Sequence, residues 1–100
     1  MDAVTTDNGN GQEAARALGE LTRALDERGF AARIVNPPAA PPFVRATSRE
    51  AVELSETVTC VPGEGGELWF RYSWGDLIAP VRHVESAAER VGHVVTPQGV

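Results

Sequence analysis

Few residues in this sequence have the types and spacing needed for catalysis or metal binding. Cys60 is the single cysteine, and alternation within a β-branched run turns it toward the core, where a thiol is usually inert. His83 and His93 match no zinc-ligand spacing. The sequence contains no phosphate-binding loop, nucleophile elbow or metalloprotease motif. It therefore indicates no catalytic residue, no metal site and no cofactor, and favours a protein that is not an enzyme.

One group of polar and aromatic residues could still bind a metabolite or support a simple reaction. Tyr72, Trp74 and Asp76 occupy alternate positions, and His83 follows where a helix is expected to begin. Asp76 could act as a general base, although aspartate beside glycine at a strand end more often forms a turn. These four residues define an alternative pocket, which would belong to a small-molecule binder or a small enzyme.

The stretch Trp69–Pro80, WFRYSWGDLIAP, must position these residues, and it contains both tryptophans and the single tyrosine. Alternation predicts a strand whose core side carries Leu68, Phe70, Tyr72 and Trp74. Trp74 is expected to be buried, so that truncating it costs about 3–5 kcal/mol. Trp69 lies on the opposite side and should cost within about 1 kcal/mol.

Two segments with helical spacing of apolar residues flank this strand in the sequence. A helix is expected to start at the N-cap Asn10 and to end at Gly29, with Phe30 folding back in a Schellman cap. Its core stripe is Ala14, Leu18, Leu21 and Leu25. A second helix is expected after Pro80, with a core stripe of Val84, Ala87, Ala88 and Val91.

Three further strands are expected at Ala31–Asn36, Phe43–Thr47 and Val52–Val61. A turn at Pro62–Gly66 then predicts a hairpin in which Cys60 opposes Leu68. The predicted fold is α+β in the order α-β-β-β-β-α, a four-stranded antiparallel sheet with two helices on one face. We expect a single domain over residues 12–96, a disordered N-terminal tail over 1–11 and a C-terminal tail over 97–100.

Charge and hydropathy exclude several classes of protein. The net charge of −5 argues against a general nucleic-acid binder, because such proteins neutralise phosphates. No apolar run approaches the roughly 20 residues that a membrane span needs. The N-terminal residues lack the basic and apolar regions of a secretory signal. A cytoplasmic protein without a membrane partner is therefore expected.

The predicted second face of the sheet is unusual, because no helix covers it and it carries aromatic and basic residues. These residues are Trp69, Arg71, Arg45, Arg33 and Phe43. Tryptophan and arginine are the types that anchor interfaces. The leading hypothesis is a non-enzymatic regulatory accessory module that docks a protein partner, or its own copy as a dimer, through this face. A further alternative is single-stranded nucleic acid, stacked on Trp69 and held by the arginines.

The central stretch also resembles a group of small, uncharacterised actinomycete proteins with no assigned activity. Their pattern is W-x-x-x-S-W-G-[DE]-x-I-A-P, between a cysteine-bearing strand with a glycine-rich turn and an alanine-rich helix. The matching residues here are Cys60, Trp69, Ser73, Trp74, Gly75, Asp76, Ile78, Ala79, Pro80, Ala87 and Ala88. The resemblance implies a cytoplasmic protein that accompanies a helix-turn-helix regulator. The chain departs from it at Val81-Arg82-His83, where those proteins have acidic residues.

Overall fold

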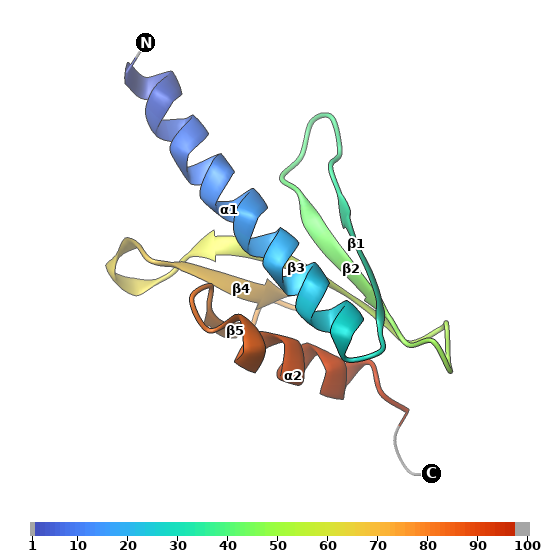
Figure 1. Cartoon of the computed structure of the whole chain (residues 1–100). Coiled ribbons are helices and arrows are strands. Elements are labelled where there is room, and N and C mark those ends of the chain that lie inside the picture. Colours follow the sequence, from blue (N-terminus) through green and yellow to red (C-terminus); the bar gives the residue numbers. More distant parts are fainter. Residues whose placement is uncertain (1, 98–100) are drawn as a thin grey trace.

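The structure is a computed structural model that describes residues 2–97. Its elements are helix α1 (Asp2–Glu27), strands β1 (Ala31–Val35), β2 (Phe43–Thr47), β3 (Ser55–Pro62), β4 (Leu68–Tyr72) and β5 (Leu77–Pro80), and helix α2 (Val84–Val94). The strands form one antiparallel sheet in the order β1-β2-β3-β4-β5 (Figure 1). The predicted α+β class, with an antiparallel sheet and two helices, is confirmed. Among the described residues, no helix is long and apolar enough to span a bilayer.

The predicted number of strands is wrong, because Leu77–Pro80 forms β5 rather than a connection to the last helix. A tight turn reverses the chain after β4, in which the Tyr72 N–H donates to the Asp76 carbonyl at 2.9 Å. Gly75 has a φ of 107°, a left-handed conformation that favours glycine. Pro80 is tolerated because an edge strand does not need every N–H for its ladder.

Helix α1 ends as the sequence predicts but begins earlier, at Asp2 rather than after Asn10. Its end is a Schellman cap, because the Phe30 N–H donates to the Leu25 carbonyl at 3.1 Å and the Gly29 N–H to the Asp26 carbonyl at 3.0 Å. Gly29 has the positive φ of 93° that this cap needs. Residue 1 of the predicted N-terminal tail and residues 98–100 of the predicted C-terminal tail lie outside the described residues.

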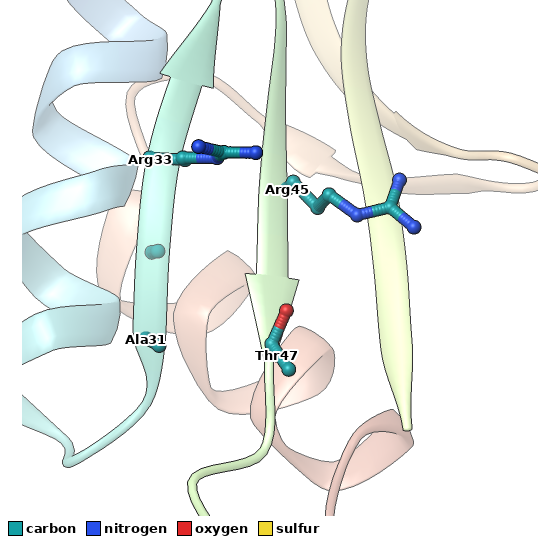
Figure 2. Close-up of a pocket in the computed structure, with 5 residues that line it drawn as sticks. Ala31, Arg33, Arg45 and Thr47 are labelled. Carbon is teal, nitrogen blue, oxygen red and sulfur yellow. The ribbon is translucent and has the colours of Figure 1, made fainter. Parts of the chain in front are cut away.

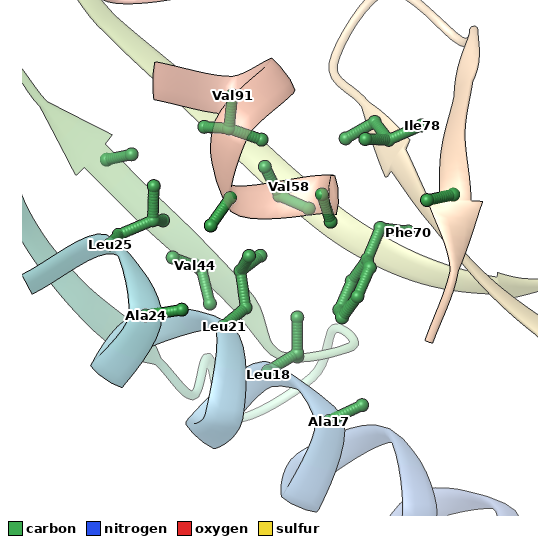
Figure 3. Close-up of a cluster of buried hydrophobic side chains, with 14 residues drawn as sticks. Ala17, Leu18, Leu21, Ala24, Leu25, Val44, Val58, Phe70, Ile78 and Val91 are labelled. Carbon is green, nitrogen blue, oxygen red and sulfur yellow. The ribbon is translucent and has the colours of Figure 1, made fainter. Parts of the chain in front are cut away.

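Both helices lie on one face of the sheet, and the core fills the space between them and the strands (Figures 1 and 3). Helix α1 contributes the predicted stripe of Leu18, Leu21 and Leu25, each at most 1% exposed. The sheet contributes Val44, Val58, Phe70 and Ile78, and α2 contributes Ala87, Ala88 and Val91. The helical and strand periodicities therefore identify the core faces correctly.

The β3–β4 hairpin has a different register from the predicted one. Cys60 pairs with Phe70 instead of Leu68, because Pro62 remains in the ladder and pairs with Leu68. The turn is correspondingly shorter and is closed by the Gly63 N–H, which donates to the Glu67 carbonyl at 2.7 Å. The register shift is an even number of residues, so each side chain that lies within both the predicted and the observed strands keeps its predicted face.

The strand β3 also begins later than predicted, at Ser55 rather than Val52. Ser48 ends β2, since its hydroxyl accepts hydrogen bonds from the backbone N–H groups of Glu50 and Ala51. These bonds turn the chain, and they leave Val52 in the loop with 74% of its surface exposed. A serine hydroxyl that binds local backbone groups has therefore overridden β propensity.

Candidate functional site

The five residues predicted as a contact surface all lie on the sheet face opposite the helices. We call this set, Arg33, Phe43, Arg45, Trp69 and Arg71, the open face. Its members are connected by strand pairing: Arg33 pairs with Arg45, Arg45 with Thr57, and Thr59 with Arg71. The three arginines are exposed and the two aromatic residues are half-buried. Strand alternation alone was enough to group them.

The arginines of the open face have no acidic partners among the described residues. The four ion pairs there involve Arg16, Arg28, Arg49 and Arg82 instead. Glu56 is the acidic residue within the strands, and it faces the helices. Arg33 and Arg45 are also directly opposite one another across two strands, an arrangement in which like charges repel. The open face is therefore basic on a chain whose net charge is −5.

The acidic residues gather on the helical side of the molecule. Among the described side chains, α1 carries Glu13, Glu20, Asp26 and Glu27, and α2 carries Glu85 and Glu89. The helices also carry Arg16, Arg23 and Arg90, so the helical side has a net negative charge, whereas the open face has a net positive one. An acidic partner would be attracted to the sheet and repelled from the helices.

Trp69 is held in place by the turn between β3 and β4. A side-chain Cβ at Gly63 would clash with Cδ1 and Nε1 of the indole, so the ring lies directly on the glycine. Its cross-strand neighbours are Val61 and Pro80. Phe43 begins β2 at the same end of the sheet where β3 ends and β4 begins. The open face thus has an aromatic end, held by the Gly63 contact, and a row of arginines beside it.

The structure brings together three of the four residues of the alternative pocket. The Trp74 ring stacks on Tyr72, with ring centroids 4.2 Å apart, and its Nε1 donates to Asp76 Oδ2 at 2.9 Å. The prediction that Trp74 is buried is wrong, because 54% of its surface is exposed. The strand ends at Tyr72, so Trp74 lies in the turn and no longer alternates toward the core. The Asp76 carboxylate accepts this hydrogen bond as part of the turn.

His83 does not join that group. It is the N-cap residue of α2, next to Pro80, whereas the concavity beside Tyr72 is formed by the other end of this helix. This concavity has a volume of about 390 Å³ and is lined by Tyr72, Glu89, Arg90, His93 and Val94. His93 therefore takes the place predicted for His83. If β5 were evident in the sequence, packing α2 antiparallel to it would place His93, rather than His83, beside Tyr72.

Two ionisable side chains beside the turn after β4, Tyr72 and Glu56, are partly or fully buried. Burial raises the pKa of Tyr72, an effect that Arg90 opposes and that Glu56 and Asp76 reinforce. The hydroxyl therefore stays protonated at neutral pH. The buried Glu56 carboxylate accepts a hydrogen bond from the Ser73 N–H and so anchors the turn. Within residues 2–97, no group of three or more His, Cys, Asp or Glu side chains could hold a metal ion.

Cys60 is half-buried beside α1, with its Sγ 4.0 Å from the Ala14 carbonyl. Burial, with a smaller contribution from the Glu13 carboxylate, raises the pKa of Cys60 to about 12. Thiols react as thiolates, and each pKa unit reduces the thiolate fraction tenfold. The native thiol should therefore react with iodoacetamide at pH 8 at least about 100-fold more slowly than the unfolded chain. Mass spectrometry of labelled protein, with and without urea, measures this ratio.

The raised pKa of Cys60 makes the folded protein less stable at high pH. The folded thiol keeps its proton up to about pH 12, while the unfolded thiol loses it above the ordinary thiol pKa of 9.0. The stabilisation is thus complete below pH 9.0 and is lost progressively as the pH rises toward 12. A Cys60→Ala variant should lack this component of the loss in urea titrations. Equal labelling of native and unfolded protein would contradict the buried placement of the thiol.

Comparison of the chain with protein-family models, with curated proteins and with solved structures found no match in any of the three. Its function therefore has to be inferred from its own residues.

Proposed function

We propose that this protein is a non-enzymatic binding module that docks an acidic protein partner on the open face of its sheet. The observation that carries the proposal is the set of Arg33, Arg45 and Arg71, exposed and without ion-pair partners among the described residues, on an uncovered face. Two like charges directly opposite one another across strands destabilise a sheet. A bound carboxylate would supply the missing countercharge, and the half-buried Phe43 and Trp69 would add apolar contact.

The charge and geometry of the described residues also favour an acidic protein over the alternative partners. Face-to-face pairing of two copies would bring their arginines against one another, which disfavours the dimer considered as a second possibility. Single-stranded nucleic acid would need a ring face free for stacking, and the half-buried Trp69 indole, with Cδ1 and Nε1 against Gly63, leaves less of the ring to a base. The small-molecule alternative is weakened because His83 lies apart from Tyr72, Trp74 and Asp76.

Charge reversal at Arg45 should separate binding from stability. In Arg45→Glu, the new carboxylate lies opposite Arg33, so repulsion becomes attraction. We expect the free energy of unfolding to stay equal or to rise by up to about 1 kcal/mol. Binding of a fluorescent glutamate-rich peptide should weaken at least about tenfold, since a close charge contact is replaced by a repulsive one. Urea unfolding and fluorescence anisotropy at low salt measure the two effects.

Arg23→Glu is the matched control, because Arg23 is exposed on α1 and makes no ion pair among the described residues. It changes the net charge equally and should leave peptide binding nearly unchanged. Equal weakening by both variants would mean that net charge alone governs the attraction, against the proposal. Tighter and more salt-sensitive binding of an oligothymidine than of the peptide would favour the nucleic-acid alternative.

A further inference from the structure

We propose that the partner binds as an added strand along the outer edge of β1, through an extended segment that alternates acidic and apolar residues. This inference rests on the proposed function, because the acidic positions would meet the arginines of the open face. It adds the conformation of the partner and its sequence pattern. The observations behind it are the difference between the two edges of the sheet and the difference between the two sides of β1.

The two edges of the sheet are not equally available. At the β5 edge the Arg90 guanidinium donates to the Ile78 carbonyl, and Pro80 has no N–H to offer. At the other edge, β1 pairs only with β2, and among the described residues no hydrogen bond outside that ladder engages Ala31–Val35. The backbone groups on the outer side of β1 can therefore pair with another chain.

On the open face of the sheet, β1 offers positive charge to an added strand. Arg33 is its central residue and lies opposite Arg45. In Figure 2 the Arg33 side chain extends toward β2 and the Arg45 side chain extends toward β3. A shallow concavity of about 320 Å³ lies over β1 and β2, lined by Ala31, Ala32, Arg33, Arg45 and Thr47. An added strand would place side chains of this face beside Arg33, whose exposed side chain can turn from its position over the sheet to meet them, so they should be carboxylates.

The helical side of β1 offers apolar surface instead. Ile34 leaves 36% of its surface exposed although it lies on the core face. It borders α1 at Gly19, where a Cβ would be only 3.9 Å from Ile34 Cδ1. A strand added to β1 would cover Ile34 with side chains of this second face, which should be apolar. Because strand side chains alternate between faces, the two requirements together specify an alternating acidic and apolar segment.

A second copy of this chain fits the edge less well. Two β1 strands related by a two-fold axis at their centre would place Arg33 opposite Arg33, which is repulsive. A charged side chain on an edge strand can instead have the sole role of preventing unwanted strand pairing. If Arg33 only prevents strand pairing, no alternating peptide binds to β1, so peptide binding distinguishes this protective role from docking.

The test uses a ten-residue peptide of alternating valine and glutamate, with a control peptide of the same composition arranged in two blocks. We expect the alternating peptide to bind at least about tenfold tighter, because only it matches both sides of β1. Amide exchange followed by NMR should slow at least about tenfold at backbone N–H groups of β1, and not in β5. Ile34→Asp, which places a carboxylate on the apolar side, should abolish the preference for alternation.

Other results would overturn the proposal in different ways. If the alternating peptide binds and depends on Arg45 but leaves the β1 amides unprotected, strand addition is wrong and docking on the open face stands. Equal affinity for the alternating and block peptides leads to the same conclusion. If neither peptide binds at low salt, strand addition and the acidic partner are both wrong. If, in addition, Arg33→Val aggregates while the natural chain stays monomeric, Arg33 protects the edge.

Discussion

Truncation of Phe70 to alanine is expected to lower the free energy of unfolding by about 3–5 kcal/mol, the range for removing a large buried aromatic side chain. Phe70 is 0% exposed and is the largest of the fully buried side chains among the described residues. It lies at the centre of β4, between Cys60 on β3 and Ala79 on β5, so the cavity borders several elements. The loss is a large share of the roughly 5–15 kcal/mol that stabilises a domain. Urea unfolding followed by circular dichroism measures it.

Trp74→Ala is the matched control, since it removes an even larger ring from a position only a few residues away. Its surface is 54% exposed, and it contributes a stack on Tyr72 and one hydrogen bond to Asp76. An aromatic pair contributes about 0.5–1.5 kcal/mol beyond burial, so the loss should stay near 1 kcal/mol. A greater loss at Trp74 than at Phe70 would show that the aromatic stretch folds with a different face inward.

The contrast between Phe70 and Trp74 shows what the sequence could predict about the fold. Alternation correctly assigned Leu68 and Phe70 to the core, and helical spacing assigned Leu18, Leu21 and Leu25. Alternation holds only while the strand lasts, and the strand ends at Tyr72. Nothing local in the sequence marks that end before Gly75. The same misplaced boundary concealed β5, whose four residues end in a proline and resemble a connection.

The candidate site was predictable to the extent that it depends on alternation. The open face was grouped correctly because each of its residues alternates away from a recognisable apolar neighbour. The opposition of Arg33 and Arg45 depends on the register of β1 and β2, which their short strands do not specify in the sequence. The exchange of His83 for His93 beside Tyr72 depends on how α2 lies along the sheet. Tertiary packing decides such relations.

The second large effect concerns Gly92, which lies buried in α2 against the Phe30 ring. A Cβ at this position would be 2.6 Å from Cε2 and 2.9 Å from Cζ of Phe30, well inside contact distance. Phe30 follows directly on the Schellman cap of α1, and its backbone is held there by the Leu25 carbonyl. In Gly92→Ala the ring must therefore swing outward and lose burial. We expect a net loss of about 1–2 kcal/mol, because overpacking exceeds the gain in helix propensity.

A double-mutant cycle isolates this contact from the intrinsic preference of a helix for alanine. In a Phe30→Ala background the obstacle is gone, so Gly92→Ala should stabilise the protein, by up to about 1 kcal/mol. Gly19→Ala is a second control, since its Cβ would meet only Ile34 Cδ1 at an ordinary 3.9 Å, and it should stabilise α1 similarly. Thermal and urea unfolding of the four proteins of the cycle give the coupling energy. If Gly92→Ala has the same sign in both backgrounds, Phe30 does not occupy the space above Gly92, and the packing of α2 against the end of α1 is different.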